Sequence, residues 1–234
     1  MEILYEDKHL LVVVKPAGML TVGYPGSHGR TVIDTLTRER QRRGLVHGAY
    51  KPYAVHRLDK DTSGVLLVAL DPKTKDLVMD TWQTMVKKRT YRALTENPRG
   101  PKWQPLPEDH TISLPLIKNA AHHTYAVDPS AAILTPEQKK QLMDAVTHFT
   151  VLEQSARGTL FELELETGRT NQIRAHLAYY GYPLAGDELY RSHINPCGRL
   201  CLHARTLEFV HPYTKELLSF EVPEPAEWAA IAKR

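Results

Sequence analysis

The chain has 234 residues, 42% of them hydrophobic and 24% charged, with a formal net charge of +3 at pH 7. This composition excludes a disordered chain, and the length suits one large domain with a substantial core. Two cysteines are too few for a disulfide framework, the acidic N-terminus is unlike a signal peptide, and no apolar run reaches membrane-spanning length, so we expect a cytoplasmic protein.

The first half of the chain predicts both strands and helices. Apolar runs indicate the strands, and the turn Lys15-Pro16-Ala17-Gly18 closes the first of them. A stretch rich in proline and polar residues, from Asn97 to Pro107, indicates a loop. The predicted strands are Leu10–Val14, Val65–Leu70 and Thr90–Thr95, and the predicted helices are Thr31–Arg42 and Asp71–Met85.

The second half predicts more strands than helices. Thr135 and Pro136 are typical of a helix start, and this helix is predicted to run to Ala145. The other elements are strands at Phe149–Glu153, Leu160–Leu165, Leu200–Val210 and Leu217–Val222, a helix at Thr170–Tyr180 and a short helix from Ala226. Without regular alternation of strand and helix, this order indicates an α+β fold with a mixed or antiparallel sheet. No composition break marks a linker, so we expect a single domain over 1–234.

The stretch HRLDKDTSG at 56–64, just before a buried strand, is rich in ionisable and hydroxylic side chains. One interpretation is a capped turn in which Asp59, Thr62 and Ser63 bond local amides. The other is a loop that presents a carboxylate beside a guanidinium at the end of a rigid strand.

This stretch resembles the HRLDxxTSG signature of the RluA family of pseudouridine synthases. Further segments resemble those of the family in the same order: KPAG at 15–18, KRTY at 88–91, GRTNQIRAHL at 168–177, GYPLAGD at 181–187, LCLHA at 200–204 and HP at 211–212. Six segments in order are far more specific than one short motif. The resemblance covers most of the chain and implies a curved, mostly antiparallel sheet flanked by helices, with a central active-site cleft.

The chain departs from the family pattern at three places. Asn171 stands where the family usually has histidine. The stretch 117–147 matches poorly, and we expect it to be an insertion that shapes RNA choice. The N-terminal S4 RNA-binding module of many relatives has no counterpart, so we expect the catalytic domain alone to recognise the substrate.

The resemblance implies a pseudouridine synthase, an isomerase that needs no cofactor and no metal. It assigns the catalytic carboxylate to Asp59, which acts at the sugar carbon C1′ as a nucleophile or as a base. Arg174 matches the cation that keeps this carboxylate ionised. Tyr91 matches the residue that accepts the C5 proton or stacks on the uracil. Which alternative holds for Asp59 and Tyr91 is left open by the sequence.

The expected partner is a structured RNA, either transfer RNA, large-subunit ribosomal RNA or both, bound by a monomer without a membrane. The target base has to leave the stacked RNA, and the resemblance assigns Arg57 to fill the gap. The other residues expected to contact RNA are His56, Lys15, Lys88, Arg89, Arg169 and Gln172. The basic run Arg38 to Arg43 is either an RNA contact or a solvated helix face.

Three other functions remain as alternatives. Cys197, Cys201 and His203, joined by His122 or His123, suggest a metal site, although their spacing is not a standard zinc pattern. An RNA-binding protein without turnover would not need the set of Asp59, Arg174 and Tyr91. A glycoside or nucleoside hydrolase would need a second carboxylate, for which Asp61 is the only close candidate.

Overall fold

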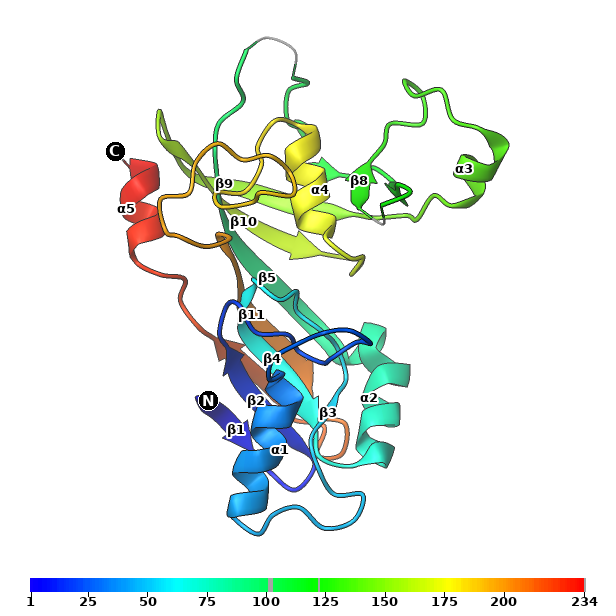
Figure 1. The fold of residues 1–234 in the computed structure, drawn as a ribbon, viewed down its shortest axis with the longest axis vertical. Helices are drawn as coiled ribbons and strands as arrows, with labels where there is room; N and C mark the ends of the chain where they lie inside the picture. Colours follow the sequence, from blue (N-terminus) through cyan, green and yellow to red (C-terminus); the bar gives the residue numbers. More distant parts are fainter. Residues whose placement is uncertain (101–102, 122, 234) are drawn as a thin grey trace. The chain divides into compact units, whose positions relative to one another are not determined.

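The computed structural model describes residues 1–100, 103–121 and 123–233, and the chain divides into two compact units (Figure 1). The first unit comprises Met1–Arg89 and His203–Glu224, and the second comprises Thr90–Leu202 and Pro225–Arg234. Among the described strand pairs within each unit, β4 and β11 run parallel and the others are antiparallel. The predicted α+β class with a mostly antiparallel sheet is therefore confirmed.

The first unit is built on adjacent strands in the order β1, β2, β4 and β11. These strands are Ile3–Glu6, Leu10–Lys15, Ser63–Ala69 and Leu202–Val210; β12 (Leu217–Glu221) pairs with β11, and β3 (Tyr53–Ala54) pairs with β4. Every residue of β4 is buried, which explains its unbroken apolar run, because a central strand covered on both faces has no solvent side.

Two helices of the first unit begin where the sequence indicates. Helix α1 (Val32–Arg42) starts at a capping box formed by Thr31 and Asp34, and α2 (Pro72–Met85) starts at the side-chain cap Asp71. The basic run Arg38 to Arg43 lies at the end of α1, and two of its residues, Arg40 and Arg43, form ion pairs with Glu6. No helix in the described part of the chain is long and apolar enough to cross a membrane.

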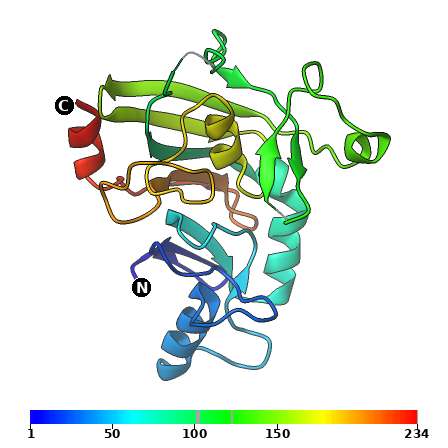
Figure 2. The same cartoon turned by 45° about the horizontal axis from the view of Figure 1, so that its top comes forward.

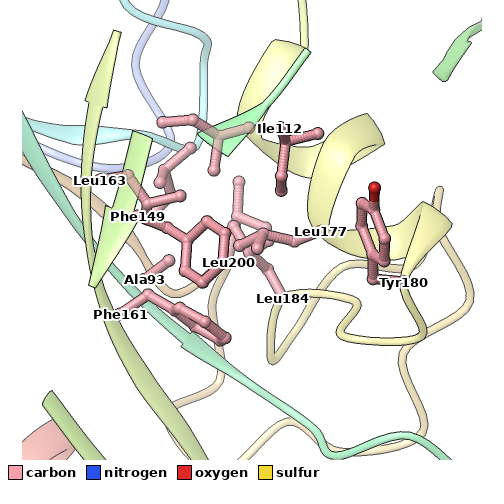
Figure 3. Close-up of a cluster of buried hydrophobic side chains, with 11 residues drawn as sticks. Ala93, Ile112, Phe149, Phe161, Leu163, Leu177, Tyr180, Leu184 and Leu200 are labelled. Carbon is pink, nitrogen blue, oxygen red and sulfur yellow. The ribbon is translucent and has the colours of Figure 1, made fainter. Parts of the chain in front are cut away.

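The second unit contains the antiparallel strands β5 (Val86–Thr95), β10 (Gly158–Leu165), β9 (Thr147–Ser155) and β6 (Thr111–Ile112) in that order; β5 begins in the first unit. Helix α4 (Gln172–Tyr179) contributes Leu177 to a buried cluster with Phe149 and Phe161 of the sheet (Figure 3). Helix α5 (Glu227–Lys233) anchors the end of the chain through Trp228, which is fully buried.

The segment 117–147 contains structure that the sequence did not predict. Strands β7 (Leu116–Lys118) and β8 (Thr124–Ala126) form a hairpin, and β8 lies beside α4 (Figures 1 and 2). Helix α3 covers only Pro136–Lys140, so its predicted extension to Ala145 was wrong. The physical reason is a competing pairing, because the backbone of Met143 exchanges two hydrogen bonds of 2.8 Å with that of Leu116.

Candidate active site

Asp59 is half-buried and lies in a turn that leads into β4, where its carbonyl accepts a hydrogen bond from the Thr62 amide (3.2 Å). The buried ammonium group of Lys15 donates hydrogen bonds to backbone carbonyls of this turn. Lys15 is fully buried, and its Nζ donates to the carbonyls of Pro16 (2.9 Å), Lys60 (2.9 Å) and Thr62 (2.7 Å). This placement favours a structural role for Lys15 over the RNA contact that the sequence suggests.

Thr21 holds the other side of the Asp59 turn. Its hydroxyl donates to the Leu58 carbonyl (2.9 Å) and accepts from the Leu58 amide (3.2 Å), and all these atoms are buried. Arg57, one residue earlier, is exposed, and its guanidinium has no hydrogen bond or ion pair with the described residues. The turn therefore combines a fixed backbone around Asp59 with a guanidinium that is accessible to a partner.

The Ser-Gly pair that ends the 56–64 stretch packs against β11. Ser63 Oγ lies 2.8 Å from His203 Nδ1, and the Val222 carbonyl lies 2.9 Å from His203 Nε2. Gly64 has a φ of +118°, and a Cβ there would lie 2.0 Å from the carbonyl oxygen of Ala204. Only glycine fits this close approach, so the HRLDKDTSG stretch at 56–64 packs directly against the LCLHA segment at 200–204.

His56 belongs to a small cluster with Trp82 and Arg89. Its Nε2 accepts a hydrogen bond from the Leu67 amide (3.0 Å), and its ring lies 4.7 Å from that of Trp82. The Arg89 guanidinium stands 5.7 Å over the same Trp82 ring. Burial and the positive charge of Arg89 together lower the pKa of His56 to about 3, so the imidazole is neutral at physiological pH. Lys88, next to Arg89, is exposed.

Tyr91 lies on β5, opposite Leu163 of β10. Its side chain is half-buried and packs against the cluster that contains Phe149 and Phe161. On the same strand, the next residue, Arg92, forms an ion pair with Glu162. The ring of Tyr91 therefore rests on a rigid support, as either proposed role of this tyrosine requires.

Arg174 lies in the first turn of α4 and is tightly held. Its Nε and Nη2 donate to the two oxygens of Asp187 (2.7 and 2.8 Å), whose carboxylate is fully buried. Its Nη1 donates to Oδ1 of Asn171 (2.9 Å), and the guanidinium lies 5.2 Å over the ring of Tyr190. Asp187 and Tyr190 were not among the predicted site residues.

Asn171, where the family pattern has histidine, contacts Arg174 in this structure. It precedes α4 with φ 56° and ψ 21°, the left-handed conformation that asparagine tolerates better than most residues. Its side chain makes no capping bond to the helix and accepts from Arg174 instead. The left-handed turn also explains why the helix begins at Gln172 and not at the predicted Thr170.

Gln172 and Arg169 differ in their availability to RNA. The buried amide of Gln172 donates to Val146 and Thr147, and it accepts from the Thr167 hydroxyl and the Arg169 amide. All four of its hydrogen-bonding positions are thus used inside the fold, which favours a structural role. Arg169 is exposed, and its Nε donates to the Asp144 carbonyl (3.0 Å).

The structure does not support the alternative of a cysteine–histidine metal site. Both ring nitrogens of His203 lie within hydrogen-bonding distance of Ser63 and the Val222 carbonyl. Burial raises the pKa of the Cys201 thiol, which disfavours the thiolate that a metal binds. Among the described residues, no three histidine, cysteine or acidic side chains gather as metal ligands, and His122 lies outside that set.

Comparison with known proteins agrees with the resemblance read from the motifs. The family model described as RNA pseudouridylate synthase matches residues 9–179. An uncharacterized RNA pseudouridine synthase of Bacillus subtilis, YlyB, is 36% identical over 99% of this chain and 71% of its own. The ribosomal large subunit pseudouridine synthase D of Nitrosomonas europaea is 36% identical over 99% of this chain and 64% of its own.

A solved structure shares the fold. The human RNA pseudouridylate synthase domain containing 4 protein superposes with a TM-score of 0.73 at 24% identity, over 98% of this chain and 91% of that one. The chain therefore belongs to the RNA pseudouridylate synthase family. It is an isomerase that converts uridine in RNA to pseudouridine.

Proposed function

We propose that this enzyme modifies specific uridines of large-subunit ribosomal RNA and that Asp59 is its catalytic carboxylate. The observation that carries the assignment of Asp59 is the turn around it, fixed by Lys15 and Thr21, in which the neighbouring Arg57 stays exposed. The ribosomal substrate is supported by the relatives named ribosomal large subunit pseudouridine synthase D. We further propose that the enzyme acts as a monomer in the cytoplasm.

The chemistry assigned to Asp59 takes place at C1′ of the target nucleotide. The C1′–N1 bond breaks, the uracil turns, a C1′–C5 bond forms, C5 loses its proton and N1 gains one, so the product is an isomer of the substrate. A carboxylate suits the first step because it can attack or stabilise an electron-poor anomeric carbon. A turn with a fixed backbone limits the reorganisation that this step requires.

Arg174 is the cation that we assign to Asp59. The contacts with Asp187 and Asn171 fix the orientation of its guanidinium. A guanidinium in a fixed orientation suits a carboxylate as its partner, because its N–H donors match the geometry of the two carboxylate oxygens. Pairing with this cation keeps Asp59 ionised where exclusion of water raises a carboxyl pKa.

The remaining assignments concern the RNA. We assign Tyr91 to the C5 proton or to stacking on the turned uracil. The exposed Arg57 fills the space that the extruded base leaves, because a planar guanidinium can stack on the neighbouring bases. Lys88, Arg89 and Arg169 are assigned to the RNA backbone.

The test is pseudouridine mapping across all stable RNAs in cells that carry either the wild-type enzyme or Asp59→Asn. We expect one or more large-subunit positions to lose pseudouridine completely in the variant, while the purified variant binds the same RNA with nearly unchanged affinity. Turnover by Asp59→Asn near the wild-type level would refute the carboxylate assignment. Loss of modification in transfer RNA alone would replace the ribosomal substrate with transfer RNA.

A further inference from the structure

His56 offers a fixed hydrogen-bond donor to solvent. In a neutral imidazole one nitrogen donates and the other accepts. Because Nε2 accepts from the Leu67 amide, the proton is on Nδ1. No described residue accepts a hydrogen bond from Nδ1. If Nδ1 were buried, it would therefore be a buried polar atom without a partner, and it is not one of these atoms. Nδ1 is thus in contact with solvent. Since the Leu67 amide belongs to a central strand, this tautomer is set by the fold.

A second donor stands on the same aromatic ring. The Arg89 guanidinium lies 5.7 Å from the centroid of Trp82, and the His56 ring lies 4.7 Å from it. Trp82 is itself half-buried and packs on the core of the first unit, so it supports both side chains from one rigid base. A cation stacked on tryptophan loses less conformational freedom when it binds a ligand than a solvated one does.

The chemistry of the cluster selects its ligand. The neutral imidazole of His56 presents Nδ1–H, the guanidinium presents only donors, and the indole has one N–H and no acceptor. A phosphate offers acceptors alone and carries the negative charge that a guanidinium pairs with, whereas base edges are uncharged and many of them offer donors as well. Exposed Lys87 and Lys88 add positive charge beside Arg89. The cluster therefore matches an anionic, acceptor-only group.

We propose that His56 and Arg89, supported by Trp82, form a subsite for one backbone phosphate of the RNA substrate. This inference rests on the proposed function of the Asp59 turn, because His56 directly precedes Arg57 in it. A phosphate contact carries no sequence information but sets the register of the strand. Here it places the nucleotide next to the target, so that the target uridine reaches Arg57 and Asp59.

Two substitutions separate this role of His56 from its structural one. His56→Gln keeps an acceptor where Nε2 lies and so keeps the bond to the Leu67 amide, but it removes the donor at the Nδ1 position. His56→Asn does the reverse, because its amide nitrogen overlies Nδ1 and nothing replaces Nε2. We expect the glutamine variant to bind RNA about ten- to hundredfold more weakly, as loss of a charge-assisted hydrogen bond predicts, with nearly unchanged stability. The asparagine variant should be less stable but bind almost normally.

Binding is measured on a large-subunit ribosomal RNA transcript, with bulk transfer RNA as the second probe, over a series of salt concentrations. Arg89→Met should reduce the slope of log affinity against log salt concentration by the amount expected for about one phosphate contact. Adding His56→Gln to Arg89→Met should weaken binding less than additively, since both groups contact the same phosphate. Lys8→Met removes an exposed charge from the same unit and serves as the control. Unchanged affinity in His56→Gln, or equal losses in both His56 variants, would overturn the subsite. If the wild-type enzyme binds neither RNA, the proposed substrates fail instead.

Discussion

The guanidinium of Arg174 and the carboxylate of Asp187 form a side-on, two-bond pair, with N–O distances of 2.7 and 2.8 Å. Asp187 is buried and comes from the loop after α4, so the arginine is oriented by a residue outside its own helix. The Tyr190 amide donates to the same carboxylate (3.2 Å), and the Tyr190 hydroxyl bonds the Thr124 carbonyl of β8. Asp187 thus orients the guanidinium of Arg174 and, through Tyr190, links it to the hairpin formed by β7 and β8.

Asp187→Asn should reduce kcat by at least about tenfold and leave RNA affinity nearly unchanged. The asparagine amide can accept only one of the two hydrogen bonds from Arg174, so the guanidinium loses its fixed orientation. The measurement is single-turnover pseudouridine formation beside RNA binding and urea unfolding. Breaking a buried pair also destabilises the protein, by about 3–5 kcal/mol in comparable cases. Asp187→Glu should recover part of kcat. If kcat of the folded variant equals that of the wild type, Asp187 only stabilises the fold.

Much of the fold was predictable because its signals are local. The capping box of Thr31 and Asp34, the Asp71-Pro72 start and the apolar run of β4 each specify one element within a few residues. Strands β6, β7 and β8 have only two or three residues each, too few for periodicity to reveal. Helix α3 ends early because of the distant partner Leu116, which no local pattern shows.

The candidate site was predictable in its motifs but not in its partners. Asp59, Tyr91 and Arg174 were found through segments resembling a family. The pairing of Arg174 with Asp187 joins two segments across a loop, and neither residue alone indicates it. Lys15 was predicted, as a basic residue, to contact the RNA backbone; in the structure it is buried, and three carbonyl oxygens compensate the burial of its ammonium group.

Arg57→Ala should lower turnover about ten- to hundredfold more on structured RNA than on a short single-stranded substrate. Extrusion of a stacked base costs a few kcal/mol, and that cost is largely absent when the target is already unpaired. Both substrates are compared by single-turnover kinetics, with Lys60→Ala as a control of similar exposure in the same turn. Equal losses on both substrates would show that Arg57 orients Asp59 instead.

Stability should fall as the pH drops from about 6.5 toward 4. Burial lowers the pKa of His176 to about 4, and that of His56 is lowered to about 3. Because unfolded histidine has a pKa of about 6.5, the unfolded chain binds more protons in this window, which favours unfolding. Each histidine contributes a slope of up to about 1.4 kcal/mol per pH unit. Carboxyl groups with lowered pKa, such as Asp7 and Glu96, also destabilise the fold on acidification, but only as the pH falls toward their unfolded pKa values of about 4, at the acid end of this window.

The slope is measured from urea unfolding at several pH values, with His176→Gln as the test variant. Glutamine can still donate to the Leu114 carbonyl, as His176 Nε2 does at 2.9 Å, but it does not titrate. The variant should be less stable at pH 7.5 and should lose less stability on acidification. A slope identical to that of the wild type would mean that His176 is not the titrating group.

Tyr91→Phe should separate the two halves of the reaction. Phenylalanine keeps the ring, so packing on the Phe149 and Phe161 cluster and stacking on the uracil should persist. Only the hydroxyl is lost, and with it the proposed acceptor of the C5 proton. Positioned proton transfer is worth about 100- to 10,000-fold, so release of this proton should slow by that order.

The measurement is tritium release from C5-labelled uridine in the substrate RNA, set beside RNA binding by filter retention. We expect binding to continue while tritium release slows, and Tyr91→Leu, which removes the ring as well, should also weaken binding. If the phenylalanine enzyme releases tritium as fast as the wild type, Tyr91 is a stacking platform and another group accepts the proton. If binding by the phenylalanine variant collapses as well, Tyr91 is chiefly a structural residue.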